Sequence, residues 1–94
     1  MITLVQQKVI LDKMLSFNPK RIGIFGSYVR GEHTTQSDLD ILVDFYGRVN
    51  LLELVGLEQE LSDLLGIKVD LITERSLTDS LKKYVMNEVI FFYE

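Results

Sequence analysis

Residues 21–45 read RIGIFGSYVRGEHTTQSDLDILVDF. The first five of them form a short β-rich run, and residues 27–31 after it are expected to form a single helical turn. A polar loop over residues 32–37 then leads into Asp38–Phe45, whose second half is apolar and partly β-branched. The pattern predicts two strands, of which the second is buried and has an acidic entrance.

A helix is predicted before this stretch, over residues 2–16. Asn18-Pro19 is expected to end it, because proline disfavours helix in the preceding residue and cannot continue one itself. We expect its broad apolar face to consist of Leu4, Leu11, Met14 and Leu15.

The clearest helix follows the stretch, from Asn50 to a stop at Gly66. Asn50 and Glu53 have the spacing of a capping box, and glycine suits a helix C-terminus. The leucines that mark one face of this helix are Leu54, Leu57, Leu61, Leu64 and Leu65.

The C-terminal part predicts a strand over residues 67–72, a turn, a helix over 78–87 and a strand over 89–93. This last strand is either part of the core or an exposed apolar edge that a partner covers. The resulting order, αβ(α)βαβαβ, predicts an α/β (α+β) fold. We expect one domain over residues 1–94, with a mixed sheet of about four strands and helices packed on one face.

Composition narrows the classes of function. The net charge is −4 with no basic run, so general nucleic-acid binding is not expected, whereas an acidic site can recruit metal ions. The absence of cysteine excludes disulfides, thiolate nucleophiles and Cys-ligated zinc. A hydrophobic fraction of 47% in 94 residues indicates a protein partner or a homo-oligomer.

Neither a signal peptide nor a membrane span is predicted. The N-terminus carries scattered charges, and no apolar stretch approaches the roughly 20 residues that cross a bilayer. A cytoplasmic location is therefore expected.

Three aspartates form the candidate catalytic constellation. Asp38 and Asp40 are two residues apart on a predicted strand, which places their side chains on one face, roughly 7 Å apart. Two carboxylates this close repel each other unless a cation lies between them, and Mg²⁺ favours such oxygen ligands. If the strand that carries Asp70 lies alongside, the three carboxylates are able to hold two metals for phosphoryl transfer.

Gly26-Ser27 forms a candidate phosphate-binding turn, because glycine allows close backbone approach and Ser27 adds a hydroxyl donor. Arg30 is expected to pair with phosphate or to brace an aspartate. Each piece also has an ordinary structural reading, as a turn, a solvated strand end or a surface ion pair. Their order and spacing favour the functional reading. The lone His33 either approaches substrate or lies exposed in the loop, and we expect the latter.

The chain resembles the nucleotidyltransferase superfamily that includes DNA polymerase beta, whose signature has the form GSxxRG…SDxDxxV. The matching residues are 26–31 and 37–43, and the eleven-residue step from Ser27 to Asp38 agrees as well. Asp70, within the sequence KVDLI, falls where the third aspartate of the family occurs.

This resemblance implies a nucleotidyltransferase fold like the polymerase beta palm. It implies that Asp38, Asp40 and Asp70 bind two Mg²⁺ ions, with Mn²⁺ as the alternative, and that Asp70 helps to deprotonate an acceptor hydroxyl. Gly26 and Ser27 would bind the triphosphate.

The short chain is similar to the minimal nucleotidyltransferases that are partners of HEPN-domain proteins. The similarity implies an antitoxin that transfers AMP from ATP to a tyrosine of a HEPN ribonuclease toxin. The alternative is a non-catalytic module that neutralises its partner sterically. A small-molecule nucleotidyltransferase is disfavoured by length.

Overall fold

The computed structural model describes residues 2–94, and it confirms the predicted order of helices and strands. Each predicted element is present, with boundaries that move by a few residues. In chain order they are α1 (Leu4–Met14), the 3₁₀ helix η1 (Leu15–Phe17), β1 (Pro19–Phe25), α2 (Ser27–Arg30), β2 (Leu39–Phe45), α3 (Leu51–Leu65), β3 (Val69–Thr73), the 3₁₀ helix η2 (Glu74–Ser76), α4 (Asp79–Glu88) and β4 (Ile90–Tyr93).

The strands form one mixed four-stranded sheet, as the sequence predicts, and their order in the sheet is β3-β2-β1-β4. β1 pairs antiparallel with both β2 and β4, whereas β2 and β3 are parallel. Parallel neighbours need a crossover connection, and α3 supplies it. In the β2–β3 register, Asp40 lies opposite Asp70.

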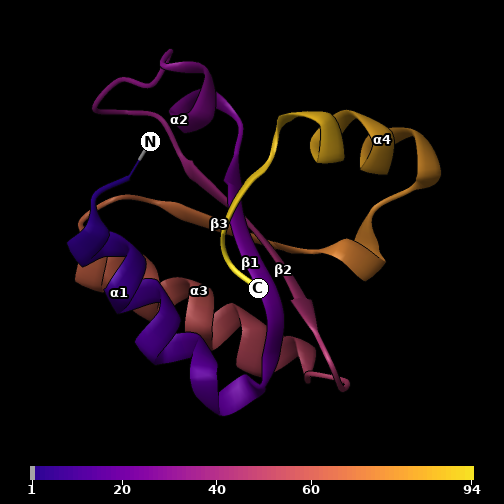
Figure 1. Cartoon of the computed structure of the whole chain (residues 1–94). Coiled ribbons are helices and arrows are strands. Elements are labelled where there is room, and N and C mark those ends of the chain that lie inside the picture. Colours follow the sequence, from indigo (N-terminus) through magenta and orange to yellow (C-terminus); the bar gives the residue numbers. More distant parts are fainter. Residues whose placement is uncertain (1) are drawn as a thin grey trace.

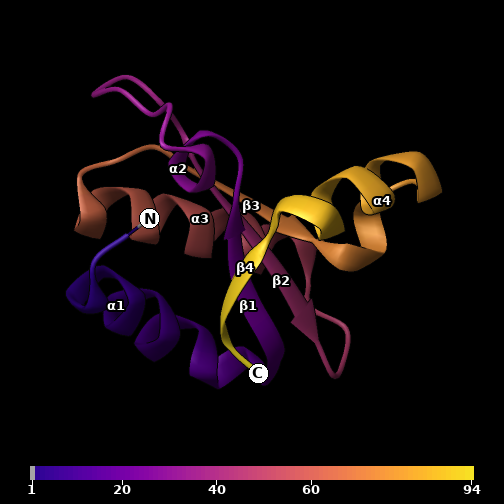
Figure 2. The same ribbon diagram turned by 45° about the horizontal axis from the view of Figure 1, so that its top comes forward.

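Helices cover both faces of the sheet, so the prediction that they lie on one face is wrong. Ile41 of β2 packs in the main core with Leu61 of α3, on the side that α1 also covers. Leu42, the next residue of β2, instead packs with Val85 of α4 in a second cluster. Successive strand residues point to opposite faces, and the apolar residues of β2 follow one another without alternation, so each face needs a cover. Figures 1 and 2 show α1 and α3 together on one side of the strands and α4 on the other.

The first helix begins at a capping box that we did not predict. Thr3 and Gln6 exchange hydrogen bonds between side chain and backbone, at 2.8 and 3.1 Å. The predicted apolar face is partly wrong, because Leu4 is 80% exposed while Ile10 and Met14 are fully buried. Six residues separate Leu4 from Ile10, which is not a whole number of helical turns. Leu15, also expected on that face, is exposed within η1.

The long helix α3 has both predicted ends. Asn50 caps it, although its Oδ1 accepts from the backbone N–H of Leu52 at 2.8 Å and not from that of Glu53. Gly66 ends it with a positive φ of 66°. Of its leucines, Leu57 and Leu61 are buried against the sheet, whereas Leu64 is 54% exposed. No helix within residues 2–94 is long and apolar enough to cross a membrane.

The two edge strands of the sheet are treated differently. On β3, the outward N–H groups of Val69 and Leu71 donate to side chains of α3, namely Ser62 Oγ at 2.9 Å and Glu58 Oε2 at 2.8 Å. β4 forms the opposite edge and pairs with β1, and its Ile90 is 47% exposed. The C-terminal strand thus combines the two alternatives: it lies at the edge of the sheet, yet Phe91, Phe92 and Tyr93 are partly buried against the two core clusters.

An ion pair fastens the segment between β3 and α4 to the sheet. Arg21 of β1 donates from Nε and Nη2 to the two carboxylate oxygens of Glu74, both at 2.7 Å. Glu74 is only 6% exposed, and the Arg21 guanidinium also lies 4.6 Å from the centre of the Phe91 ring. This ion pair holds η2, which leads into α4, against the same face of the sheet that carries Asp40.

Candidate active site

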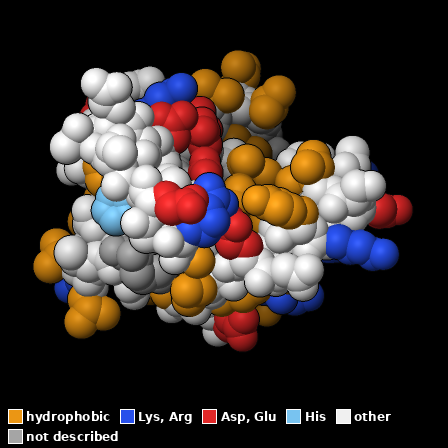
Figure 3. All heavy atoms as spheres, turned by 90° about the horizontal axis from the view of Figure 1, so that it is seen from above, with side chains coloured by type: hydrophobic (Ala, Val, Ile, Leu, Met, Phe, Trp, Pro, Cys, Tyr) orange, Lys and Arg blue, Asp and Glu red, His pale blue; other side chains and the backbone are white. Residues whose placement is uncertain are grey.

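The structure brings the three predicted aspartates together. Asp40 near the start of β2 and Asp70 on β3 are register partners, and Asp38 precedes β2 by one residue. The predicted adjacency of the two strands is thus confirmed. All three side chains are partly buried, on the side of the sheet that α4 covers incompletely. Figure 3, seen from above relative to Figure 1, shows acidic side chains gathered in a band at this end of the molecule, with basic side chains beside them.

The carboxylates perturb one another. Burial, followed by the nearby charges of Asp70 and Asp38, raises the pKa of Asp40 to about 6, although the charge of Arg30 opposes the shift. Burial also raises the pKa of Asp70, together with the charge of Asp38 and a hydrogen bond to it, against the effect of Lys68. Lys68 Nζ lies 3.7 Å from Asp38 Oδ2. Like charges held this close favour uptake of a proton or of a cation.

The donor set suits a hard divalent cation, although it is not arranged as a finished metal site. Among residues 2–94, no three His, Asp or Glu side chains are already placed to hold a metal ion. Burial and mutual charge repulsion instead raise the pKa of Asp40 and the pKa of Asp70. Carboxylate ligands bind a metal in the deprotonated form. Metal binding at these residues is therefore expected to compete with protons and to involve side-chain adjustment.

The turn after β1 is built against Asp40. Gly26 adopts a φ of +79°, which residues with a side chain rarely adopt, and it is buried. A Cβ added to Gly26 would lie 2.1 Å from Asp40 Oδ2. The positive φ therefore favours glycine here, and any larger residue would also have to displace the Asp40 carboxylate. Ser27 follows directly as the first residue of α2, so the predicted phosphate-binding turn and the aspartates lie side by side.

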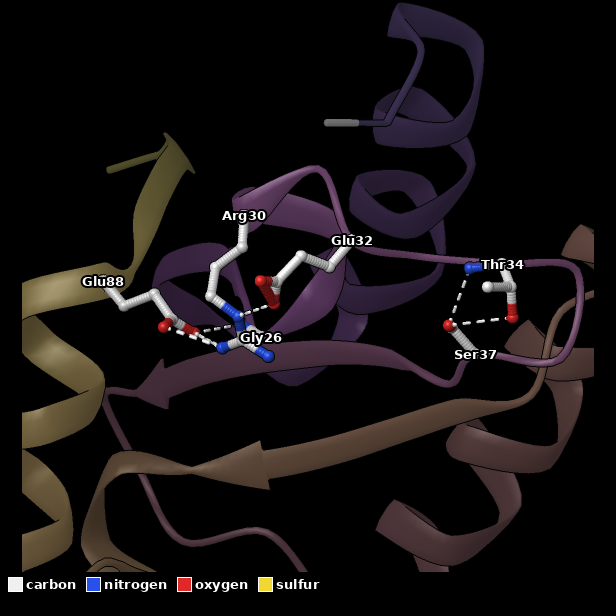
Figure 4. A network of polar contacts seen from close by, with 6 residues as sticks. All are labelled: Gly26, Arg30, Glu32, Thr34, Ser37 and Glu88. Carbon is white, nitrogen blue, oxygen red and sulfur yellow. Dashed lines mark hydrogen bonds and ion pairs between the residues drawn. The ribbon is translucent and has the colours of Figure 1, made fainter.

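Arg30 lies at this turn but is already paired with two carboxylates. Its Nε donates to Glu32 at 2.7 Å, and its Nη1 donates to both oxygens of Glu88 at 2.9 and 3.0 Å. Glu88 Oε1 also accepts the backbone N–H of Gly26. Figure 4 shows Glu32 and Glu88 approaching the guanidinium from opposite sides. The charge of Arg30 lowers the pKa of Asp40, but the ion pairs of Arg30 are with the two glutamates and not with an aspartate, which the bracing alternative expected.

Sequence reasoning missed Glu88 altogether. It is the last residue of α4 and lies 62 positions from Gly26, so no local motif joins the two. One signal was present, because an acidic residue in the last turn of a helix opposes the helix dipole and needs a compensating partner. Arg30 is that partner.

The loop between the turn and the aspartates is ordered by its own contacts. The hydroxyl of Ser37 accepts the backbone N–H of Thr34 at 2.8 Å, which closes a tight turn just before Asp38 (Figure 4). His33 is exposed, as expected, and its ring stacks on Tyr28 with centroids 4.2 Å apart. The stacking fixes the loop relative to α2.

Residues 6–92 match the model of the nucleotidyltransferase domain family. The chain belongs to this family. A relative from Methanocaldococcus jannaschii is 46% identical over 86 residues, which cover 90% of this chain and 85% of the relative. The protein adenylyltransferase MntA of Thermococcus cleftensis is 48% identical over 75 residues, covering 80% of this chain and 76% of MntA. The chain is thus an enzyme of the nucleotidyltransferase type, as the sequence predicts.

Solved structures have the same fold. A toxin–antitoxin crystal structure with AMP-PNP contains a chain that is 27% identical, with a TM-score of 0.84 over 96% of this nucleotidyltransferase and 73% of that chain. A Shewanella oneidensis complex of a tri-AMPylated HEPN toxin with its MNT antitoxin matches at 23% identity and a TM-score of 0.77, over 95% of this chain and 70% of that one. The predicted nucleotidyltransferase fold is confirmed.

Proposed function

We propose that this protein binds a nucleoside triphosphate with two divalent cations and transfers the nucleoside monophosphate, AMP from ATP, to a tyrosine hydroxyl of a HEPN-domain toxin. The observation that carries the proposal is the meeting of three carboxylates with a glycine turn at one end of the sheet. Because Asp40 lies against Gly26, a phosphate held at the turn is also within reach of cations held by the aspartates.

Each residue has a specific part in this proposal. Asp38, Asp40 and Asp70 would hold two Mg²⁺ ions, which supply neutralisation of phosphate charge and activation of the attacking oxygen. Gly26, Ser27 and Arg30 would hold the triphosphate. The acceptor oxygen forms a bond to the α-phosphorus as the bond from that phosphorus to the pyrophosphate oxygen breaks. Asp70 takes the hydroxyl proton, as a carboxylate within reach of the attacking oxygen can do.

The relatives support a protein acceptor. The T. cleftensis relative is a protein adenylyltransferase, and the structure with AMP-PNP is that of a toxin–antitoxin pair. A toxin partner would also cover exposed apolar side chains, of which Leu52 is 80% exposed and Leu51 74% exposed. The protein would then act as the antitoxin by modifying the toxin.

The proposal is tested by label transfer from α-³²P-ATP to the purified partner toxin in the presence of Mg²⁺. The wild-type protein should label the toxin, whereas Asp38→Asn and Asp40→Asn should not. Asp12→Asn is a matched control, because it removes an exposed carboxylate from α1, on the other face of the sheet. Normal transfer by either site variant would contradict the proposed role of the aspartates.

The exposed apolar residues also favour a second function, namely steric neutralisation without catalysis. Leu4 and Val5 on α1 are 80% and 74% exposed, so a partner has apolar surface to cover away from the aspartates. Co-expression with the toxin separates the two functions. If the Asp38→Asn/Asp40→Asn double variant still restores growth, steric neutralisation suffices; if growth fails while the complex persists, catalysis is required.

A further inference from the structure

Glu88 joins the last helix to the phosphate-binding turn. Its Oε1 accepts the backbone N–H of Gly26 at 2.5 Å and Nη1 of Arg30 at 3.0 Å, and its Oε2 accepts the same Nη1 at 2.9 Å. The Glu88 side chain is only 14% exposed. One carboxylate therefore connects the end of β1, the short helix α2 and the end of α4 (Figure 4).

This placement is unfavourable for α4 taken alone. A negative charge in the last turn of a helix opposes the dipole, and a carboxylate removed from water needs compensating donors. Gly26 and Arg30 provide those donors. Both are residues to which the proposed function assigns contacts with the triphosphate.

Glu32 provides an internal comparison on the same guanidinium. It binds Nε of Arg30 at 2.7 Å, but its side chain is 64% exposed and lies only two residues along the chain. Exposed ion pairs of this kind contribute little, because water and salt screen them. Glu88, in contrast, is largely withdrawn from solvent and also binds the backbone of the turn.

We infer that Glu88 is a positioning residue for nucleotide binding. Both carboxylate oxygens of Glu88 accept from Nη1 of Arg30, which fixes the guanidinium relative to the turn, whereas the contact with the exposed Glu32 adds little. The bond from Gly26 fixes the turn itself at the same time. This inference rests on the proposed function, and it adds a residue of α4 to the apparatus that prepares the site for a triphosphate.

The opposite role for Glu88 would be that of an internal competitor, in which its carboxylate occupies the donors and the triphosphate displaces it. The contacts favour positioning, because departure of Glu88 would strip a largely buried carboxylate of both Gly26 and Arg30. The two roles predict changes of opposite sign in nucleotide affinity when the charge of Glu88 is removed.

The test compares Glu88→Gln, Glu88→Asp and the matched control Glu32→Gln. Calorimetry with MgATP, and transfer kinetics with the toxin, should show affinity weakened and KM for ATP raised by about tenfold in Glu88→Gln, the scale of one lost charged hydrogen bond. The value of kcat at saturating ATP should change much less. Glu88→Asp should recover part of the loss, and Glu32→Gln should remain within about twofold of wild type.

Several outcomes would overturn the inference. Tighter MgATP binding by Glu88→Gln would show that Glu88 competes with the nucleotide, and unchanged binding would show that Glu88 does not position the site. A lowered melting temperature with an unchanged KM would show that it only stabilises the fold. Equal losses of MgATP affinity in Glu88→Gln and Glu32→Gln would show that Glu88 matters no more than the exposed Glu32. Wild-type protein that binds MgATP but does not modify the toxin would refute the proposed function alone, whereas wild-type protein that binds no triphosphate would refute both.

Discussion

The two faces of the sheet are made by the same strands, but one face buries apolar side chains and the other partly buries carboxylates. Towards α1 and α3, β1 and β2 present Ile24 and Ile41, both fully inaccessible to solvent. Towards α4, one residue earlier on β2, the same strand presents Asp40, whose pKa is raised to about 6 by burial and like charge. Because successive side chains of a strand point to opposite faces, neighbouring residues of β2 belong to a stabilising core and to a destabilising acidic site. Stability and chemistry should respond to different substitutions.

The largest difference between an effect on activity and an effect on stability is expected at Asp40. Asp40→Asn should lower the transfer rate by about a thousandfold, since the metal contribution to such reactions amounts to several kcal/mol. The variant should be at least as stable as wild type to urea, because one of the mutually repelling carboxylates is gone. Rate and urea midpoint, measured on the same preparation, check this. A clear loss of stability would mean that the acidic face supports the fold.

The apolar face should behave in the opposite way. Leu61 is fully buried between α3 and the sheet, and Leu61→Ala should lower the free energy of unfolding by about 3 kcal/mol. Leu52→Ala, on the same helix but 80% exposed, should change it by less than about 0.5 kcal/mol. Urea unfolding measures both. KM for ATP should stay unchanged in each variant where the folded state predominates.

Substitution of Arg21 tests whether contacts on the face of the sheet covered by α4 contribute to stability. Arg21→Ala leaves the carboxylate of Glu74, 6% exposed, without its bidentate partner, and should cost about 2 kcal/mol since Arg21 is partly exposed. The double variant Arg21→Met/Glu74→Leu removes both charges and should recover much of this loss. Thermal unfolding of the three proteins decides the matter. No recovery would indicate that the ion pair itself, and not the stranded charge, is what matters.

The smallest effect concerns pH. Because the pKa of Asp40 is raised from 3.8 to about 6, the folded protein binds this proton more tightly than the unfolded chain does. The associated stability is complete below about pH 4 and is lost as the pH rises through 6. The metal-free melting temperature should fall between pH 5 and 7, less steeply in Asp40→Asn and also less steeply with added Mg²⁺. A slope identical in wild type and Asp40→Asn would contradict this cause.

The sequence was sufficient where structure depends on neighbouring residues. The helices and strands follow from periodicity, and the meeting of Asp40 with Asp70 follows because a strand–helix–strand unit places parallel strands side by side. It was insufficient where distant segments meet. Neither the bond from Gly26 to Glu88 nor the pairing of Arg21 with Glu74 leaves a local pattern. The position of α4 was missed for a related reason: the consecutive apolar residues of β2 do not say which helix covers which face.

The edge at β3 sets a limit on self-assembly. Ser62 and Glu58 of α3 occupy the outward amides of Val69 and Leu71, so an incoming strand finds those donors already taken. Sheets that polymerise need two edges that accept strands, one for each neighbour in the growing array. An added strand would therefore find fewer free amide donors at β3 than at β4. Association through strand pairing is expected at the β4 edge, and two side chains of α3 disfavour growth at the β3 edge.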